Sequence, residues 1–450
     1  MDRPDIVFIV LDSVRCDRLS TYGAIRNTAP ALDEFSSQSL KFENAYTPAP
    51  WTLPSHASMF TGLAPSEHGL TNGFVDRSCE LPEEFETVAQ RLSSSGYRTA
   101  GFSNNPWVGS LSGLHRGFDE FVEWDLEITS TSDQSFHTTR ERLMSTFHTV
   151  FGTIHRQPAF LLKRRFFTSQ LIDRAIRWLD ESAMSRQPSF TFLNLMEAHS
   201  PYFPPRSSFK ELNLPAPGPI EPRLLNTKLL AYVMDRYDLD PTQRERILEY
   251  YDASVRYQDR KVGELLDHLY RTNQFDETLV VICSDHGKTL GEHDRSATPP
   301  HYLRRINTDV PLLIRPPGQR SGRCISTPVE LTNLFDLFLA GGVSPEVTLS
   351  TEGFALIEDY HPHTGRESTD VTCWRALADG EYRYIRSDSG EDYLFQHGEL
   401  IEEADSFHEW MGAALDERID QMTFHEKTSA TQTTIGSAVE QQLTDLGYLE

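Results

Sequence analysis

The sequence predicts an α/β fold in which one large, mostly parallel sheet is covered by helices on both faces. Three apolar runs rich in β-branched residues, at 5–11, 189–196 and 278–283, have the pattern of strands buried on both faces. Stretches with helical periodicity separate these runs, and alternation of strand and helix is typical of a parallel sheet between two helical layers. A chain of 450 residues is long enough to add a smaller unit to such a domain.

The helical stretches follow the first strand in the order 28–40, 82–94, 169–183 and 242–270. Thr242 is a favoured type of N-cap residue for the last of them. Seven prolines between 201 and 222 predict an irregular loop near the edge of the sheet.

We expect three parts in the chain: a catalytic α/β domain over 1–355, a small antiparallel-sheet subdomain over 356–412, and a polar helical tail over 413–450. Short strands at 382–385 and 392–395, joined by a turn-like Asp-Ser-Gly-Glu sequence, support the second part. An insertion at 130–168 contains a basic patch that suits a substrate lid or a lipid contact. We favour a surface helix whose apolar face points toward the core, because amphipathic helices are common in soluble proteins.

The charge of the chain limits the classes of partner that it is expected to bind. The formal net charge is −24, and only seven of the 42 basic residues are lysines. Nucleic acid is therefore an unsuitable partner, since phosphate backbones are bound by positive patches. Such a surface suits a salt-rich cytoplasm, where screening weakens self-repulsion, so we expect a halophilic protein. The first residues do not resemble a signal peptide, no run is long enough to span a membrane, and we expect a cytoplasmic location. The five scattered cysteines are expected to be reduced packing residues.

Polar side chains follow each of the three buried strands. Asp12 follows the first, Glu197 and His199 follow the second, and Asp285 and His286 follow the third. Ligands bind at this edge of open α/β sheets. Carboxylates gathered there suit a hard divalent cation, and histidine extends the choice toward manganese or zinc. Asp12, Asp285 and His286 are therefore candidate metal ligands, although each could also be a helix cap or loop staple.

Thr52 stands before Leu53-Pro54, where a helix is expected to begin. Threonine is a favoured N-cap, and capping would be a sufficient role. The N-terminus of a helix is also an anion site, and a hydroxyl held there beside a cation would be an activated nucleophile. Both interpretations remain open from the residues alone.

Five stretches of the chain, in this order and spacing, resemble the sulfatase family of the alkaline phosphatase superfamily. They are "PDIVFIVLDSVRCDRLSTYG", "TLPSHASMFTGLAPSEHG", "MEAHSPYFPP", "SDHGKTLGEH" and "VPLLIRPPG", and "RALADGEYRYIR" resembles the C-terminal subdomain of that family. The resemblance covers about residues 4–340 and implies a sulfatase-like fold with one divalent metal ion, Mn, Ca or Mg rather than Zn.

The resemblance also implies roles for individual residues. Asp12, Asp285 and His286 would bind the metal, and Thr52 would be the nucleophile and touch the metal. His199 would assist the leaving group, with His301 as a less certain second residue. His56 is a further candidate catalytic residue, expected to bind the non-bridging oxygens together with Asn104 and the helix N-terminus. We expect Asn104, Asn105 and Lys288 to bind substrate.

The chain departs from the family pattern at the site. Sulfatases carry cysteine or serine at the position of Thr52 and convert it to formylglycine; the extra methyl group should prevent this, so we expect no formylglycine. His56 replaces an arginine, and Ser13 replaces the second of two paired aspartates. Asn104 and Asn105 stand where sulfatases often have a Gly-Lys-Trp-His stretch.

We therefore predict a metal-dependent hydrolase that cleaves an anionic ester, most of all a phosphodiester or phosphonate monoester, by attack of Thr52. An unmodified threonine with one metal is the arrangement of the phosphoglycerol transferases in the superfamily, which makes such a transferase an alternative. A sulfatase acting on a sulfated glycan or small molecule is another. A non-catalytic anion-binding protein is a third, suggested by Ser13 and His56. The expected partner is a small anionic ester or a glycan or lipid headgroup; the sequence does not determine the oligomeric state.

Overall fold

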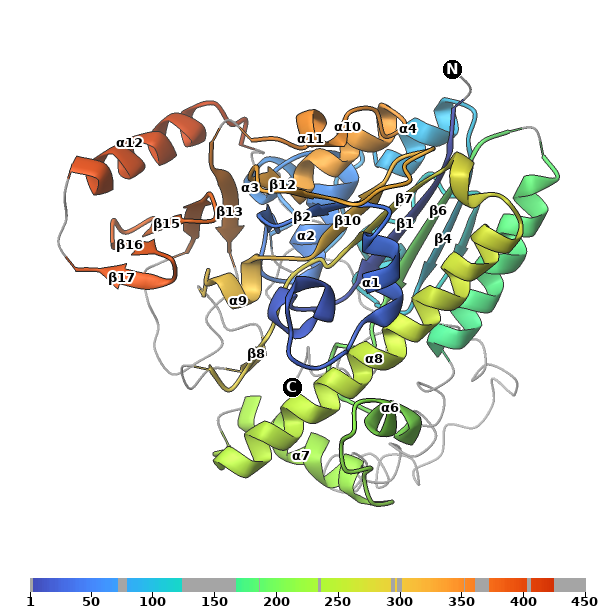
Figure 1. Ribbon diagram of the computed structural model, residues 1–450. Coiled ribbons are helices and arrows are strands. Elements are labelled where there is room, and N and C mark those ends of the chain that lie inside the picture. The colour runs from blue at the N-terminus through green and yellow to red at the C-terminus, as the bar shows by residue number, and fades with distance from the viewer. Residues whose placement is uncertain are drawn as a thin grey trace, which may run out of the picture.

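The computed structural model describes residues 3–71, 79–123, 167–185, 187–233, 236–292, 296–297, 302–351, 353–360, 372–402 and 406–424. Figure 1 shows a large sheet flanked by helices and a smaller sheet beside it, at the left of the view. The predicted insertion at 130–168 falls outside these ranges except for its last two residues. His301 and residues 425–450 of the predicted tail also lie outside them.

The large sheet has eight strands and is mostly parallel, as predicted. The strands in spatial order are β11 (Arg323–Ile325), β2 (Leu40–Phe42), β10 (Leu312–Arg315), β7 (Thr278–Cys283), β1 (Asp5–Leu11), β6 (Ser189–Leu195), β4 (Arg98–Ser103) and β5 (Glu120–Val122). The five from β7 to β5 are parallel neighbours, whereas β10 runs antiparallel to β7 and β2. The three predicted apolar strands are the central ones, and two have the predicted bounds.

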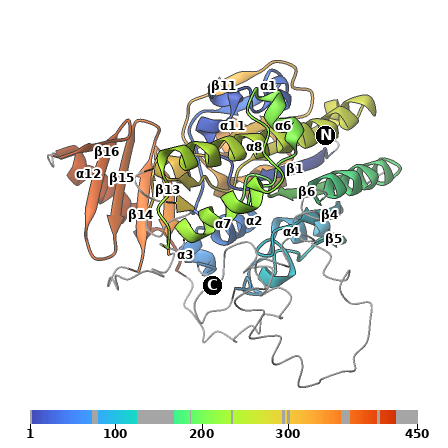
Figure 2. The ribbon, with the colours of Figure 1, turned by 90° about the horizontal axis from the view of Figure 1, so that it is seen from below.

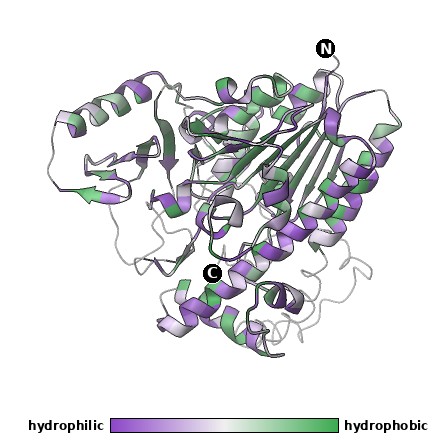
Figure 3. Cartoon of the chain, in the orientation of Figure 1, coloured by the Kyte–Doolittle hydropathy of each residue, from purple (hydrophilic) through white to green (hydrophobic). Residues whose placement is uncertain are grey.

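Alternate residues of each central strand face two separate hydrophobic cores. Val7 and Ile9 of β1 pack under α1 (Pro30–Ser36), α8 (Pro241–Arg271) and a helix at 167–183. Ile6 and Phe8 face the opposite side, under α2 (Thr52–Thr61), α4 (Val88–Ser94) and α10 (Leu334–Leu339). The strands are therefore apolar on both faces, and Figure 3 shows them as a hydrophobic layer between helices of mixed character. Figure 2 shows α8 crossing over the sheet.

Several helices begin later or end earlier than their patterns predict. Helix α1 stops at Ser36 because Leu40 already pairs as part of β2. Helix α4 begins after Thr87, whose hydroxyl accepts the N–H of Gln90 while the Gln90 side chain accepts the N–H of Thr87. The prediction of Thr242 as a cap was wrong, because Asp240 caps α8 and Pro241 occupies the first helical position.

The proline-rich segment at 201–222 is not wholly irregular. It contains α6 (Arg206–Glu211) and ends in the first turn of α7 (Glu221–Val233). The remaining elements are β3 (Ala45–Tyr46), α3 (Pro65–His68), β8 (Thr289–Leu290), β9 (Ser296–Ala297), α9 (Arg305–Thr308), β12 (Val329–Glu330) and α11 (Pro345–Thr348).

The second sheet is antiparallel and has five strands. They are β13 (Ala355–Asp359), β14 (Trp374–Ala378), β15 (Tyr382–Ser387), β16 (Asp392–Gln396) and β17 (Glu399–Ile401). Met411 and Leu415 of α12 (Ser406–Asp420) pack on one face of this sheet. Tyr46 and Leu303 pack on the other face, and they belong to the large unit, which is the large sheet with its flanking helices and loops. The predicted strands at 382–385 and 392–395 are confirmed as parts of β15 and β16, while the boundaries of the three predicted parts stay a prediction.

Two further expectations concern membrane-spanning helices and the cysteines. Within the described residues, the structure contains no helix that is both long enough and apolar enough to span a membrane. All five cysteines are free, but Cys324 is exposed and does not serve as the packing residue that we expected.

Candidate active site

The carboxyl ends of three neighbouring strands bring the predicted site residues together. β1 lies between β6 and β7 and is parallel to both, so Asp12 and Asp285 emerge at the same edge of the sheet. His199 follows β6 after a turn in which its N–H donates to the carbonyl of Met196, at 3.1 Å. The topology therefore accounts for the convergence that the sequence predicts.

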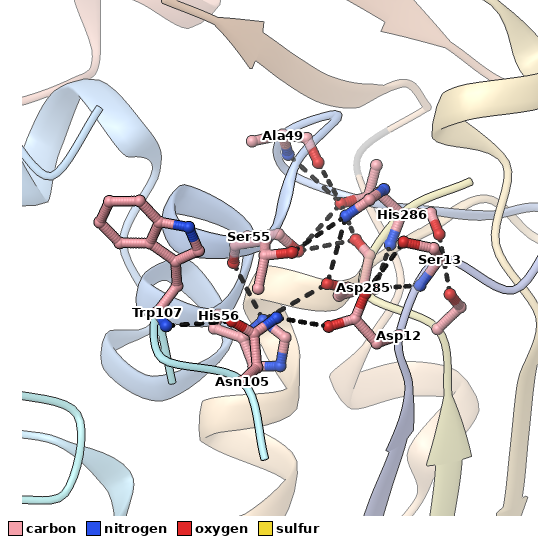
Figure 4. Close-up of polar contacts among 12 residues, drawn as sticks. Asp12, Ser13, Ala49, Ser55, His56, Asn105, Trp107, Asp285 and His286 are labelled. Atoms are coloured by element: carbon pink, nitrogen blue, oxygen red, sulfur yellow. Dashed lines mark hydrogen bonds and ion pairs between the residues drawn. The ribbon is translucent and has the colours of Figure 1, made fainter. Parts of the chain in front are cut away.

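Asp12, Asp285 and His286 form a compact buried cluster (Figure 4). One ligand atom from each lies within 4.8 Å of the others. The Ser13 N–H donates to Asp285 Oδ1 at 2.9 Å, and the Ser13 hydroxyl donates to Asp12 Oδ1 at 2.9 Å. Ser13 has a φ of 62°, which turns its N–H and hydroxyl toward the two carboxylates. The residue that replaces an aspartate thus orients both acids instead of adding a third charge.

Thr52 faces this cluster. It is the first residue of α2, the N-cap position belongs to Trp51, and no side chain caps the helix. The Thr52 Oγ1 atom lies 3.2 Å from His286 Nε2. His286 donates its Nδ1–H to the Gly287 carbonyl at 2.6 Å, which leaves the Nε2 lone pair directed toward the hydroxyl. Capping therefore does not explain Thr52.

His56 lies one helical turn after Thr52 and is completely buried. Its Nδ1–H donates to the Thr52 carbonyl at 2.9 Å, and Nδ1 is 3.6 Å from Asp285 Oδ2. Burial lowers the pKa of His56 to about 4, so the ring is neutral at pH 7. A neutral ring bonded in this way has no further N–H to donate, so the expected contact of His56 with a non-bridging oxygen stays a prediction.

The two predicted asparagines take different positions after β4. Asn105 donates from Nδ2 to Asp12 Oδ2 at 2.7 Å and accepts the N–H of Trp107 at its Oδ1, at 3.0 Å. Its amide is thus engaged in holding Asp12. Asn104 is also buried, and its Oδ1 has no hydrogen-bond partner within the described part of the chain. Of the pair, Asn104 is the better placed to meet a ligand.

Lys288 and His199 both form a hydrogen bond with Ser200. The Lys288 Nζ atom donates to the Ser200 hydroxyl at 3.0 Å, and His199 Nδ1 bonds the Ser200 carbonyl at 2.6 Å. Both side chains are almost fully buried. With Nδ1 occupied, Nε2 is the atom of His199 that can exchange a proton with a ligand. His301 lies outside the described residues, so its predicted place beside His199 stays a prediction.

The acids of the cluster are strongly coupled. Burial and the charge of Asp12 raise the pKa of Asp285 well above its usual range. Burial acts the same way on Asp12, but the neighbouring histidines, led by His199, and the Asn105 hydrogen bond bring its pKa below the usual range. Burial also lowers the pKa of His286 to about 4, so its ring is neutral and able to act as a ligand at pH 7.

This donor set fits a divalent cation. Asp285 Oδ2 is buried and has no hydrogen-bond partner among the described residues, which is costly for a carboxylate oxygen. A cation between Asp12 and Asp285 would offset their repulsion and use that oxygen together with His286 Nε2. The structure therefore contains a candidate metal site.

Supporting residues that the sequence analysis did not select surround this site. Thr47 and Ser55 both donate hydroxyl hydrogens to the backbone carbonyl of Asp285. Asn194 lies inside β6, and neither end of its amide has a hydrogen-bond partner among the residues described. An asparagine inside an otherwise largely apolar strand was the signal in the sequence, because asparagine is depleted in strands.

Comparison with known proteins agrees with this architecture. A choline-sulfatase of Rhizobium meliloti (strain 1021) is 27% identical over 400 residues, which are 84% of this chain and 75% of the relative. The phosphonate monoester hydrolase of Agrobacterium radiobacter has a similar structure, with a TM-score of 0.68 at 17% identity over 93% of this chain and 95% of that one. A protein solved with its substrate D-glucosamine-2-N,6-O-disulfate also has a similar structure. Its TM-score is 0.68 at 16% identity, over 93% of this chain and 98% of that one.

The fold and the site define an ester hydrolase of the sulfuric or phosphoric type. The family model for sulfatases matches residues 4–340, and the chain belongs to that family.

Proposed function

We propose that this protein is a metal-dependent hydrolase of phosphodiesters or phosphonate monoesters in which Thr52 is the nucleophile. One observation carries the proposal: the Thr52 hydroxyl lies beside the acidic cluster, 3.2 Å from His286 Nε2, at a helix start where it caps nothing. An unmodified hydroxyl can form a phosphoryl intermediate that water clears, whereas a sulfated threonine lacks the elimination route that formylglycine provides. The chemistry of Thr52 therefore favours phosphorus over sulfur.

Asp12, Asp285 and His286 would hold the metal, with Thr52 next to it. A bound divalent cation supplies a Lewis acid that lowers the pKa of a neighbouring hydroxyl and offsets the charge of the substrate. Thr52, as the first residue of α2, would attack the phosphorus from the N-terminus of that helix. Because Pro54 has no N–H and Ser55 donates to Trp51, that turn can offer only the N–H groups of Thr52 and Leu53 to a non-bridging oxygen.

His199 would donate a proton from Nε2 to the leaving oxygen, since its Nδ1 is fixed by the Ser200 carbonyl. Lys288 and Asn104 would contact the non-bridging oxygens, each through a side-chain nitrogen that carries N–H donors. Asn105 and Ser13 would act as positioning residues for the two acids.

The test is a rate comparison in molar potassium chloride with Mn²⁺ on bis(p-nitrophenyl) phosphate and p-nitrophenyl sulfate. We expect the phosphodiester to react faster. Thr52→Ala should lower its rate by at least about 10³-fold, and Thr52→Ser, which keeps the hydroxyl, should retain much of it. Mass spectrometry of the peptide around residue 52 checks that the side chain is unmodified. Phosphodiester hydrolysis that does not depend on residue 52 would overturn the proposal.

Sulfate-ester hydrolysis is the second candidate, favoured by the relationship to a choline-sulfatase. It predicts faster release from p-nitrophenyl sulfate. It also predicts that Thr52→Cys, produced together with a formylglycine-generating enzyme, exceeds the native protein on that ester. Failure of the converted variant to gain sulfatase activity would count against it.

A further inference from the structure

A cavity of about 240 Å³ lies outside the residues assigned so far, between the large unit and the second sheet. One wall is the segment around α9, and the other comes from β15 and β16, which Figure 1 shows on either side of this junction. The lining residues on which the argument depends are Arg304, Arg305, Asp309, Glu381, Arg383 and Phe395. The cavity therefore joins parts of the chain that are about 80 residues apart.

Arg304 is the unusual residue of this cavity. Its guanidinium lies over the ring of Phe395, 3.8 Å from the centroid. Within the described ranges it has neither a carboxylate at ion-pair distance nor a hydrogen-bond acceptor. Its half-buried position and the neighbouring Arg383 lower the pKa of Arg304, although the group stays cationic. A stacked guanidinium with unused donors is prepared for bidentate contact with an oxyanion.

The surroundings of Arg304 carry an excess of positive charge. Arg305 and Arg383 share one acid, Asp309. Arg383 is buried, and its Nε has no hydrogen-bond partner in the part of the chain described. Glu292, a further acid of the wall, is paired with Arg15 outside the cavity.

Glu381 is the remaining acid at the cavity. It is half-exposed and accepts a hydrogen bond from Gln396. After these pairings, one shared aspartate and one solvated glutamate face three arginines, so the interior favours an anion.

The cavity shares a wall with the candidate active site. Gly287, next to His286, donates its N–H to the Asn307 carbonyl at 2.8 Å. A Cβ atom at Gly287 would lie 1.9 Å from the carbonyl oxygen of Ile306, a residue that lines the cavity. The backbones of Gly287 and Ile306 are therefore packed directly against each other, and they form the wall that the two sites share.

We propose that this cavity is a second anion site, in which Arg304 binds a sulfate, phosphate or carboxylate group with Arg383 beside it. The group could be the second acidic group of an extended substrate or a free anion, and the chemistry of recognition is the same. The first source rests on the proposed function, because it requires an ester in the neighbouring site; anion binding itself does not.

The binding test compares the full-length native protein with Arg304→Gln, Arg304→Lys and the control Arg320→Gln. Arg320 is an exposed arginine paired with Asp276, away from the cavity. The unfolding midpoint is followed as potassium chloride is replaced by potassium sulfate at constant ionic strength. The active-site cluster is the same in all four proteins, so differences between them report the cavity.

We expect the native protein and Arg320→Gln to show the same saturable rise in midpoint. Arg304→Gln should need at least ten times more sulfate for the half-maximal rise or lose it altogether. Arg304→Lys, which keeps the charge but not the planar fork, should fall between them, and it covers the case in which the glutamine variant does not fold. Identical sulfate curves for the native protein and both Arg304 variants would overturn the site.

A second arm distinguishes the two sources by calorimetric binding of a monosaccharide monosulfate and the corresponding disulfate. If the cavity takes a group of an extended substrate, the disulfate binds more tightly to the native protein, and Arg304→Gln removes this advantage. If it takes a free anion, the two sugars bind equally while the sulfate response still depends on Arg304. Neither readout uses turnover, so loss of the Thr52 hypothesis would leave both results interpretable.

Discussion

Asp285 is the residue on which metal binding depends most directly. Its Oδ1 accepts the N–H groups of Ser13 and His286, whereas its Oδ2 has no hydrogen-bond partner among the described residues. Asp285→Asn keeps the shape of the side chain and one acceptor but removes the charge. We expect it to weaken Mn²⁺ binding by at least about 100-fold without unfolding the protein.

Calorimetric titration with Mn²⁺ and a circular dichroism spectrum measure these two effects. Asp33→Asn is the control, because Asp33 lies in α1, accepts the hydroxyls of Ser20 and Thr21, and is not a member of the cluster. Full metal occupancy in Asp285→Asn would show that the ligand assignment is wrong.

The buried carboxyl of Asp259 makes the stability of the protein depend on pH. It is buried in α8 and accepts the N–H groups of Ala31 and Leu32 at the start of α1. Burial raises its pKa to about 6, above the unfolded value near 4. The stability gained by binding this proton is therefore present below about pH 4 and is lost as the pH rises through about 6.

Asp259→Asn should remove this loss. The absolute stability of the variant will fall, because an amide N–H then faces a backbone N–H. Relative to the native protein, however, its free energy of unfolding should improve by about 1 to 3 kcal/mol between pH 4 and pH 7. Urea unfolding at the two pH values measures it, with the exposed Asp416→Asn as control. Equal pH slopes in all three proteins would contradict the prediction.

At the scale of elements, the N-terminus of α8 tests the observed cap against the predicted one. Asp240 accepts the N–H of Gln243 at 2.9 Å, while Thr242 lies inside the first turn. Asp240→Ala should lower the free energy of unfolding by about 1 kcal/mol, and Thr242→Ala should change it by less than about 0.5 kcal/mol. A larger loss for Thr242→Ala, measured by denaturant unfolding, would restore the sequence-based assignment.

The elements that the sequence predicted well are those whose signal is local. β1 and β7 are continuous apolar runs, and their bounds were predicted to the residue. The early end of α1 at Ser36 depends on pairing of Leu40 with Ile314, a residue that comes 274 positions later in the chain. No window around residue 36 contains that information.

The features of the candidate site also divide into those with a local signal in the sequence and those that depend on distant contacts. Asp12, Asp285 and His286 were found because each follows a buried strand. The bond from Asn105 to Asp12, the neutral state of His56 and the cavity beside Arg304 depend on turns and on docking between distant segments. These features follow from packing, which residue types and spacing do not specify.

At the scale of the whole molecule, the net charge of −24 predicts a dependence on salt. Self-repulsion between acids falls as the Debye length shrinks from about 10 Å at 0.1 M to about 3 Å at 1 M ionic strength. We expect the unfolding temperature to rise steadily from 0.1 M to 2 M potassium chloride. Calorimetric scans across that range measure it, and full stability and activity in dilute buffer would remove the halophilic interpretation.

The central place of β1 in the large sheet has a consequence for the newly made chain. β1 is synthesised before the other strands that the structure describes, yet its partners are β6 and β7, and the contact from Ser13 to Asp285 spans 272 residues. At roughly 5–20 residues per second, this strand waits on the order of ten seconds to a minute before β7 is made. Through that interval its apolar faces and both hydrogen-bonding edges lack their native cover. The nascent protein should therefore depend on chaperone binding to its N-terminal segment, and it acquires its candidate catalytic cluster only after His286 has left the ribosome.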